Sequence, residues 1–480
     1  MDSVERSREF TPFEKYYFWR NKLNMYSNFR VAVEYSEELT LDAIHYALHD
    51  MVRQHSSLSM NAYEKERYVP FIQFPYVLKF MRNYKLSDVL TVIEDDTKSV
   101  TDVFNQLQNV HFDYGSKRPL WSLILLNRKT LVYYSDHLLF DGSSGLNFHR
   151  VFSEYLSKYK KKKVSGNTLQ FDSNESFLFD IEDTQYKFNI APKPSDLIDY
   201  KVPVFYVLYV MMMICFPKSL LSIIKYYFID DGNISRSRTY NMISLSKKMI
   251  QMNNTTNDGD QCKLVHISQD KLQTLIGDCR KYNVKLTSLL VVMSLLSISK
   301  ITGDERDTMV VIPVNSRDKI KDETINKDFG LYLGDLNLEL PPVSRMCNNG
   351  KINWSFVKYV NDYIHRSRKN SQRDLALTGL IDTKMFLEQR KMCYDNTMIG
   401  TLLVSNLGNL KTPKDKGNEL DNGIFENAYF DQPCKSGVLS LFAMNVISTQ
   451  KGGAHLALHS VNPQWLDVFN EGVTFQLSQF

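Results

Sequence analysis

The chain has 480 residues, of which 43% are hydrophobic, 12% aromatic and 23% charged. This composition is typical of a globular protein and excludes disorder over most of the length, and a chain this long is expected to form two domains. The formal net charge of +4 is small for the size of the chain, so the charge balance gives no reason to expect a nucleic-acid partner.

The cysteines indicate a reduced, intracellular protein. They are scattered along the sequence, none pairs with another as CxxC, and none lies near a histidine at zinc spacing. Buried thiols fit this pattern better than disulfides or a metal site. Residues 1–17 are charged and lack an apolar h-region, so no secretory signal is expected. The six cysteines are Cys215, Cys262, Cys279, Cys347, Cys393 and Cys434.

An aromatic helix is predicted at residues 10–26. Phe13, Tyr16, Tyr17 and Arg20 recur there at the three-to-four spacing of one helix face. Two interpretations of this face stay open: it packs into the core, or it lies on a membrane surface. The alternating run that follows at 29–35 predicts a strand.

A second helix is predicted at residues 40–58, with Thr40 as its natural N-cap. Its inward face is predicted to hold Leu41, Ile44, Leu48 and Met51. Farther along, the apolar runs 121–126 and 130–135 are separated by a polar NRK turn. Two strand-length runs around a short polar turn predict a β-hairpin.

A third helix is predicted at residues 146–163, and it ends in a run of four lysines, 160–163. A solvated helix end that favours cations through the helix dipole is the expected structure. Contact with anionic lipid or with the phosphates of CoA is the alternative.

Residues 166–261 are predicted to form a crossover between two halves of the chain, because both ends of this segment have the polar composition of loops. An apolar run at 202–216 lies between them and is stopped by Pro217 and Lys218. About 20 apolar residues are needed to span a bilayer. Spanning, contact with a membrane surface, and burial in the protein all stay open for this run.

The second half, residues 262–480, mixes strands and helices, which predicts an α+β architecture with mixed sheets. Ser268 is the predicted N-cap of a helix whose inward residues are Leu272, Leu275 and Cys279. The predicted strands are 263–268, 309–317, 401–408, 440–448, 454–460 and 473–478. The predicted helices are 269–284, 287–300 and 354–370, of which the second is apolar nearly all round and is expected to be buried.

One short motif carries most of the functional signal. The stretch YYSDHLLFDGSSG, residues 133–145, places His137 at the end of an apolar strand, with Asp141 four residues on and Gly142 directly after. Loops that leave a buried strand often present functional side chains. The apolar triplet 138–140 is expected to hold the loop down, and Gly142 to allow a tight turn with no Cβ to obstruct a ligand.

This motif and its surroundings resemble the CoA-dependent acyltransferase superfamily, and more closely the fungal alcohol acetyltransferase family. The resemblance rests on EKYYFWRNKLNMYSNFRVAVEY, PLWSLILL, YYSDHLLFDGSSG, TSLLVV, PVNSR, DFG and VSNLG, which occur in this order along nearly the whole chain. It implies two chloramphenicol-acetyltransferase-like domains with an active-site channel between them. The expected division is 1–165 for the half with the motif, 166–261 for the crossover and 262–480 for the second half.

The resemblance implies that His137 is the catalytic base; a structural histidine with satisfied hydrogen bonds is the alternative. A neutral imidazole can take the proton of an attacking nucleophile and return it to the thiolate of CoA, with no covalent acyl-enzyme. The resemblance also implies that Asp141 is structural and pairs with an arginine, for which Arg317 is the candidate. A turn-forming Asp before Gly, with no partner, is the alternative. Ser135 and Asp136 are treated as loop residues.

The tetrahedral intermediate of acyl transfer needs a donor for its oxyanion. Ser405 and Asn406 of VSNLG are the candidates, and shaping of a strand end is the alternative for both. The DFG sequence, residues 328–330, lacks the WG that follows it in related plant enzymes. Its implied role is structural, so it stays outside the predicted catalytic set.

The predicted function is transfer of an acyl group, most simply acetyl from acetyl-CoA as co-substrate, to a hydrophobic alcohol, a sterol or a sphingoid-like amine. No metal and no nucleic acid are expected. Peripheral membrane contact and an intracellular place at the endoplasmic reticulum or lipid-droplet surface, or else in the cytoplasm, are expected. The alternatives are a non-catalytic lipid-binding protein on the same scaffold and a serine hydrolase suggested by GSSG, although Leu146 stands where G-x-S-x-G needs glycine.

Overall fold

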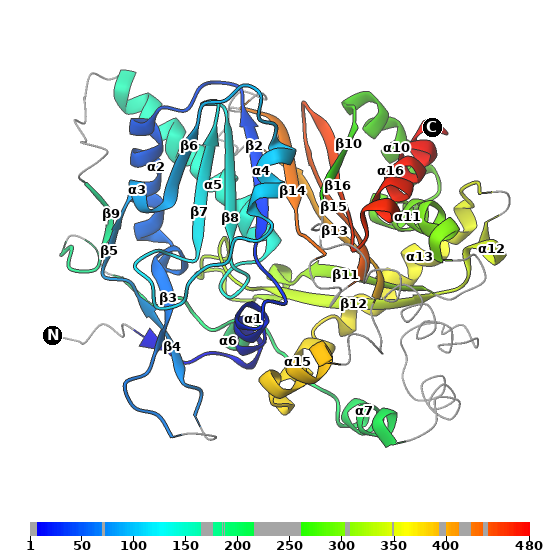
Figure 1. Cartoon of the computed structure of the whole chain (residues 1–480), viewed down its shortest axis with the longest axis horizontal. Coiled ribbons are helices and arrows are strands. Elements are labelled where there is room, and N and C mark those ends of the chain that lie inside the picture. The colour runs from blue at the N-terminus through cyan, green and yellow to red at the C-terminus, as the bar shows by residue number, and fades with distance from the viewer. Residues whose placement is uncertain are drawn as a thin grey trace.

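The computed structural model covers residues 1–480, and the structure describes residues 7–69, 73–164, 176–184, 186, 188–215, 261–302, 308–347, 350–392, 400–411, 424–434 and 440–480. Two large sheets stand side by side, each with helices on its outer side (Figure 1). The predicted α+β class with mixed sheets is confirmed.

The described elements of the first half alternate strands with short and long helices. In chain order they are β1 (Ser7–Arg8), α1 (Pro12–Lys22), β2 (Phe29–Tyr35), α2 (Leu41–Gln54), β3 (Met60–Glu64), β4 (Tyr76–Phe80), β5 (Asn83–Lys85), α3 (Leu86–Val89), β6 (Leu90–Ile93), α4 (Val100–Leu107), β7 (Trp121–Leu126), β8 (Thr130–Ser135), α5 (Gly142–Val164), β9 (Phe177–Asp180), α6 (Pro194–Leu197) and α7 (Val204–Cys215).

The second half contributes longer strands. Its described elements are β10 (Lys263–Ile267), α10 (Gln269–Lys281), α11 (Leu286–Thr302), β11 (Thr308–Asn315), β12 (Leu333–Leu340), α12 (Val343–Met346), α13 (Trp354–Ser367), α14 (Arg373–Ala376), α15 (Thr383–Met392), β13 (Gly400–Leu410), β14 (Phe425–Asp431), β15 (Ser440–Thr449), β16 (Gly453–Ser460) and α16 (Pro463–Ser478).

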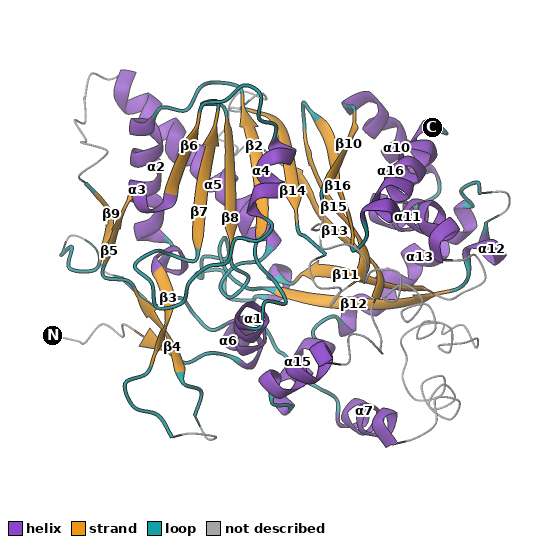
Figure 2. Ribbon diagram, viewed as in Figure 1, coloured by secondary structure: helices purple, strands orange, loops and turns teal. Residues whose placement is uncertain are grey.

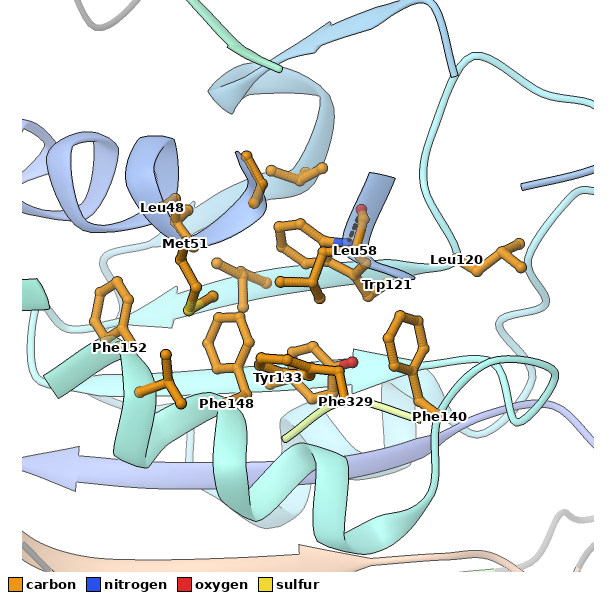
Figure 3. Packing of buried hydrophobic residues seen from close by; sticks show 14 of the residues in the cluster. Leu48, Met51, Leu58, Leu120, Trp121, Tyr133, Phe140, Phe148, Phe152 and Phe329 are labelled. Atoms are coloured by element: carbon orange, nitrogen blue, oxygen red, sulfur yellow. Dashed lines mark hydrogen bonds between the residues drawn. The ribbon is translucent and has the colours of Figure 1, made fainter. Parts of the chain in front are cut away.

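The first sheet has the strand order β14-β2-β8-β7-β6 and contains the predicted hairpin β7–β8. Alternate residues of a strand point to opposite faces. Val31 and Val33 accordingly join the core under α2 and α5, while Ala32 packs with α4 on the other face. That core is rich in aromatic rings, and the Trp121 indole donates to the Leu58 carbonyl at 2.7 Å (Figure 3). The strand that precedes His137 is therefore rigidly held.

The second sheet has the order β10-β16-β15-β13-β11-β12 and is mixed, because β11–β13 and β13–β15 are parallel pairs. The helices α10, α11, α13 and α16 lie on its outer side (Figure 2). Helix α11 is buried over most of its length, as its nearly all-round apolar sequence predicts.

The two sheets meet at β14. This strand comes from the second half but pairs antiparallel with β2 of the first, and it lies between the sheets (Figure 1). The division of the chain at residues 165 and 261 stays a prediction, and β14 crosses it. Much of the predicted crossover, including residues 216–260, lies outside the described residues.

The predicted aromatic helix is α1, and its aromatic face packs into the core. Thr11 caps it in a capping box with Glu14, and Pro12 occupies its first turn. Phe13, Tyr17 and Phe18 are buried, so the interpretation of this face as a membrane surface is wrong. The reason is that β4, α15 and the loop after β8 surround the helix and provide the apolar partners that its rings need.

Three details of the sequence-based elements are wrong. Residues 473–478 belong to α16 rather than to a strand, because Asn462 caps a helix that packs its apolar stripe onto α11. Leu41 is 42% exposed, since it stands at the first residue of α2 beyond the reach of the core. Ser268 occupies the N-cap position of α10 but makes no side-chain cap hydrogen bond.

Residues 204–215 of the apolar run form α7, and the side chains described at its start are exposed or half-buried. Phe205 is 80% exposed and Val204 72% exposed, so burial in protein is the wrong interpretation for this end of the run. Among the described residues, no single helix is long and apolar enough to cross a membrane. Taken together, the bent helix pair α10–α11 is long and apolar enough. However, α11 is a buried core helix, and a core helix of this kind passes the same test of length and composition.

Candidate active site

His137 stands at the end of β8, in the loop that leads into α5. Its ring lies 4.9 Å from the ring of Tyr17, 5.1 Å from that of Tyr26 and 4.9 Å from that of Phe29. Nδ1 lies 2.7 Å from the carbonyl oxygen of Phe140. Because a carbonyl can only accept, Nδ1 carries the proton in this contact and Nε2 is the nitrogen with the free lone pair.

The loop around His137 is held by buried apolar residues. Leu138, Leu139 and Phe140 are all buried, as predicted for the triplet. Burial also lowers the pKa of His137 to about 4, since the charged form loses its hydration, and the nearby Arg20 lowers it further. The imidazole is therefore neutral, and able to accept a proton, across the physiological pH range.

Asp141 forms a bidentate ion pair with Arg317. The Arg317 Nη1 lies 2.7 Å from one carboxylate oxygen and Nη2 lies 2.9 Å from the other. The carboxylate also accepts from the backbone N–H groups of Ser144, at 2.8 Å, and Tyr332, at 3.0 Å. The ion pair joins the two halves of the chain, and Asp141 is not an isolated turn residue.

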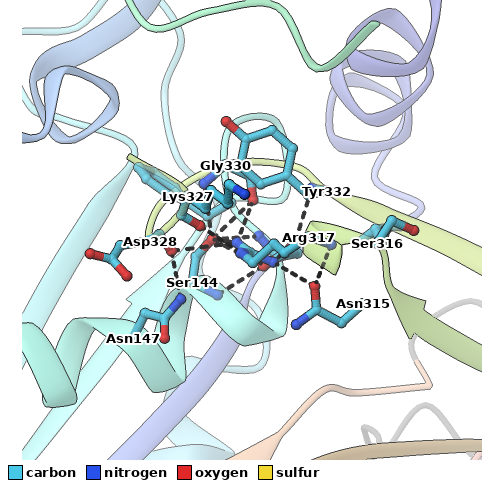
Figure 4. Close-up of polar contacts among 12 residues, drawn as sticks. Ser144, Asn147, Asn315, Ser316, Arg317, Lys327, Asp328, Gly330 and Tyr332 are labelled. Carbon is cyan, nitrogen blue, oxygen red and sulfur yellow. Dashed lines mark hydrogen bonds and ion pairs between the residues drawn. The ribbon is translucent and has the colours of Figure 1, made fainter. Parts of the chain in front are cut away.

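Arg317 ties the DFG segment into the same network (Figure 4). Its guanidinium donates to the carbonyl oxygens of Lys327, at 2.7 Å, and Gly330, at 3.2 Å. The Ser144 hydroxyl lies 3.0 Å from the Gly330 carbonyl and 3.0 Å from Asp141. The DFG segment thus contributes backbone groups that fix the loop of His137, which agrees with its place outside the predicted catalytic set.

Asp136 is more than a loop residue, because its side chain holds the loop of His137 through several hydrogen bonds. This role was not predicted from the sequence. Its buried carboxylate accepts from the backbone N–H of Leu138 at 2.6 Å, from the Tyr114 hydroxyl at 3.3 Å and from the Asn21 amide. Burial raises its pKa to about 6. An Asp that bonds the N–H two residues on is a signature of an Asx turn, so the sequence Asp136–His137–Leu138 did hold a signal for this contact.

A cavity of about 90 Å³ opens beside His137. Residues from both halves line it, which places it between the two sheets. The lining from the first half is Tyr16, Tyr17, Arg20, His137, Asp141, Gly142 and Ser143. The lining from the second half is Val311, Pro313, Val314, Asn315, Leu333, Asp335, Leu403, Ser405, Asn406, Leu407, Phe430 and Gln432.

Ser405 and Asn406 reach this cavity from β13, so the structure brings both oxyanion candidates to the same space as His137. The Asn406 amide donates to the Thr287 hydroxyl at 3.1 Å, and its side-chain oxygen accepts from the Gly408 N–H at 2.8 Å. Ser405 is buried. Asn406 therefore also shapes the strand end, the alternative that the sequence left open.

Gly142 opens α5 without a positive φ, so a tight turn is not what requires it. A Cβ at this position would lie 2.9 Å from Leu407 Cδ2 and 3.2 Å from the ring of Phe430. Glycine is instead required because α5 begins directly against side chains of β13 and β14, on the wall of the cavity.

The contacts of the GSSG serines do not form a hydrolase triad. The Ser144 hydroxyl is hydrogen-bonded to Asp141, Arg317 and Gly330. The nearest downstream histidine, His149, has Nδ1 at 3.0 Å from the Tyr35 hydroxyl and Nε2 at 3.0 Å from the Val31 carbonyl. Neither nitrogen is available to activate a serine.

Three residues that are distant in sequence come together in the fold. The possible metal-ligand atoms of Cys262, Asp431 and His459 all lie within 4.8 Å of one another. The sequence search for zinc spacing missed it because only the pairing of β14, β10 and β16 assembles it. The Arg30 guanidinium lies 2.6 Å from the Asp431 carboxylate, and this buried cation makes the place unsuited to a metal ion. The four cysteines described with their side chains, Cys262, Cys279, Cys347 and Cys434, are buried, as predicted.

Two known proteins whose sequences match nearly the whole chain are acetyltransferases by name. N-acetyltransferase SLI1 of Saccharomyces cerevisiae is 23% identical over 471 residues, which cover 94% of this chain and 94% of that protein. Alcohol O-acetyltransferase 2 of the same yeast is 23% identical over 521 residues, covering 93% of this chain and 90% of that protein.

Solved structures share the fold across the whole chain. The trichothecene 15-O-acetyltransferase TRI3 of Fusarium sporotrichioides superposes with a TM-score of 0.61 at 12% identity, covering 100% of this chain and 98% of that one. A mutant starter condensation domain of rhizomide synthetase, in complex with C8-CoA, superposes with a TM-score of 0.53 at 10% identity, covering 98% and 94%. The family model of alcohol acetyltransferases matches residues 11–467, and the chain therefore belongs to the alcohol acetyltransferase family, an enzyme family of acyl transfer.

Proposed function

We propose that this enzyme transfers an acetyl group from acetyl-CoA to a hydrophobic alcohol or amine, with His137 as general base. One observation carries the proposal. His137 lies on the wall of a cavity between the two halves, with Nδ1 fixed on the Phe140 carbonyl and Nε2 as its basic nitrogen. Base catalysis of acyl transfer needs a neutral imidazole of fixed tautomer beside the reacting groups.

The proposed step balances without a covalent enzyme intermediate. The acceptor oxygen or nitrogen attacks the thioester carbonyl carbon as His137 Nε2 takes its proton. The carbonyl electrons move to oxygen and form a tetrahedral oxyanion. When the C=O bond re-forms, the C–S bond breaks and the thiolate of CoA takes the proton from His137. Such a base typically contributes about 10²–10⁴-fold to the rate.

Acyl-CoA as the donor has support of two kinds. The two relatives that match nearly the whole chain are acetyltransferases by name, and one structural neighbour was solved with C8-CoA. The described residues around His137 also offer no serine or cysteine nucleophile paired with a histidine, which favours direct transfer between two bound substrates. Acetyl is the simplest acyl group consistent with the names of the relatives.

A hydrophobic acceptor is favoured by the cavity lining. Aliphatic and aromatic side chains from α1, β11, β13 and β14 form a large part of its lining, among them Tyr17, Val311, Leu403 and Phe430. Apolar wall area favours apolar ligands, and the polar groups between these side chains can fix the orientation of the ligand. The two yeast relatives differ in the atom named as acceptor, nitrogen in one and oxygen in the other, and the proton transfer to His137 serves both.

Peripheral membrane contact belongs to the same proposal. Helix α7 exposes Val204, Phe205, Leu208 and Met211 on a helix that carries no charged residue. An apolar helix surface of this kind can lie in the interface of a bilayer, where apolar acceptors are dissolved. We accordingly propose the surface of the endoplasmic reticulum or of lipid droplets as the place of action.

The test is acceptor-dependent release of CoA by the purified protein. Acetyl-CoA would be supplied with medium-chain and branched alcohols, sterols and sphingoid amines, and the acetylated product identified by mass. The proposal predicts release with at least one apolar acceptor and stoichiometric product. Release only with small water-soluble acceptors would contradict the acceptor class, and labelling of a serine by a fluorophosphonate would favour hydrolysis instead.

A further inference from the structure

Arg20, on α1, is a buried cation that forms no ion pair with a carboxylate of the described residues. Its side chain is only 2% exposed, and its Nε has no hydrogen-bond partner. Among the residues that the structure describes, no carboxylate lies within ion-pair distance of it. Its guanidinium lies instead over three rings, at 5.6 Å from Tyr16, 5.3 Å from Tyr17 and 4.9 Å from Tyr26.

The acidic groups nearby are engaged elsewhere. Asp136 is held by Asn21, Tyr114 and the backbone of Leu138. Asp141 is held by Arg317, and Asp335 has a partner of its own. A buried charge that lacks a paired partner is costly, and cation–π contacts offset only part of the cost. The faces of the three rings stabilise the cation, while its N–H groups can still donate hydrogen bonds to another ligand.

Arg20 and His137 lie close together on the wall of the cavity. Both line the cavity, and two tyrosines lie against both of them: Tyr17 at 5.3 Å from the guanidinium and 4.9 Å from the imidazole, and Tyr26 at 4.9 Å and 5.1 Å. The positive charge of Arg20 also contributes to lowering the pKa of His137, which agrees with this proximity. An anion bound at Arg20 would therefore lie next to the base.

We propose that Arg20 is a catalytic residue that donates hydrogen bonds to the oxyanion of the tetrahedral intermediate. The inference rests on the proposed acyl transfer and names the group that stabilises its transition state. In that step the carbonyl electrons of the thioester move to oxygen as the acceptor attacks, and the guanidinium binds the resulting negative charge. When the C–S bond breaks, the oxyanion's electron pair re-forms the C=O double bond. Arg20 only donates hydrogen bonds during these steps, so it neither gains nor loses a proton.

A fixed cation in a water-excluded site suits this role, since it stabilises charge that develops only in the transition state. Ser405, on the opposite wall, can donate at most one hydrogen bond to the same oxygen. A purely structural role, in which Arg20 only holds the tyrosines together, is the competing explanation. Lys22 provides a matched control for it, because it lies on the same helix over the rings of Phe18, Tyr76 and Tyr114 but is exposed and outside the cavity.

The test compares Arg20→Gln, Arg20→Lys and Arg20→Ala with Lys22→Gln in the CoA-release assay. Loss of one oxyanion donor typically lowers kcat by about 10²–10³, and the proposal predicts a loss of that size in Arg20→Gln, with KM for acetyl-CoA changed by only about threefold or less. Arg20→Lys, which keeps a cation over the rings, should fold normally and lose less. Lys22→Gln should retain the wild-type kcat.

Chemical rescue separates catalysis from structure. Methylguanidine in the assay should restore at least about a tenth of the lost rate in Arg20→Ala, by filling the space of the missing group, and should not restore activity to His137→Ala. Wild-type kcat in Arg20→Gln, or absence of rescue in a folded Arg20→Ala protein, would overturn the inference while the proposed function stands. Absence of transfer by the wild-type protein itself would overturn both.

Discussion

Replacing Asp141 by Asn should destabilise the protein through the charge that it leaves behind. The carboxylate side chain is 3% exposed and that of Arg317 is 11% exposed, and the two make a bidentate contact at 2.7 and 2.9 Å. Asparagine keeps one oxygen for the backbone N–H groups but cancels the negative charge. Removing one partner of a buried ion pair costs about 3–5 kcal/mol, mainly because the other charge stays buried and unpaired.

The measurement is urea unfolding of a double-mutant cycle built from Asp141→Asn and Arg317→Met. Each single variant should lose about 3 kcal/mol or more, and the double variant should lose about 0.5–3 kcal/mol less than their sum, because the second change removes the stranded charge. Glu94→Gln is the matched control, since its pair with Arg128 is 57% and 59% exposed. Exposed pairs contribute about 0–1 kcal/mol.

A loss below about 1 kcal/mol in Asp141→Asn, equal to that of the exposed control, would refute the reasoning. So would strict additivity of the two single variants, because it would mean that the two side chains act independently. The activity of Asp141→Asn should also fall at equal folded fraction, since the same carboxylate fixes the start of α5 behind His137.

Three further predictions concern pH, packing and membranes. Burial lowers the pKa of both His137 and His149 to about 4 from 6.5; the unfolded chain therefore binds more protons between those values, and urea stability should fall as pH drops from 6.5 to 4. Gly142→Ala should cost about 1–3 kcal/mol of unfolding free energy by overpacking, and lower kcat. Phe205→Ser should weaken flotation with anionic liposomes, because it removes a ring of α7 that is 80% exposed.

Each of these has its own control. The raised pKa of Asp136, about 6 against 3.8, acts with the opposite sign, so a stability that rises on acidification would show that the carboxyl outweighs the histidines. Gly277→Ala, where an added Cβ meets nothing within 4 Å, should not destabilise. Phe475→Ser removes a ring that is 58% exposed on the distant α16, and equal loss of liposome binding in both Ser variants would contradict a specific role of α7.

The parts of the site that lie on one short stretch could be predicted from the sequence. Alternating apolar residues and a polar turn fix the β7–β8 hairpin locally, and this hairpin delivers His137 to its loop. The pairing of Asp141 with Arg317 was reached through the family resemblance, because nothing local joins residues 176 positions apart.

The remaining features depend on contacts that no short window records. Residues 473–478 have β-branched and aromatic side chains, yet the cap at Asn462 and the packing on α11 make them helical. The environment of Arg20 is another such feature. Three tyrosines surround its guanidinium, and no carboxylate among the described residues pairs with it. Strand β14 likewise finds its partner β2 across the whole length of the chain.

The central claim is that His137 accepts the proton of the acceptor during acyl transfer. The most direct measurement is kcat for acetyl transfer by His137→Ala beside His365→Ala, a control histidine that is exposed on α13. We predict a loss of about 10² or more for His137→Ala and wild-type kcat for the control. Equal rates for His137→Ala and the wild-type protein would contradict the claim.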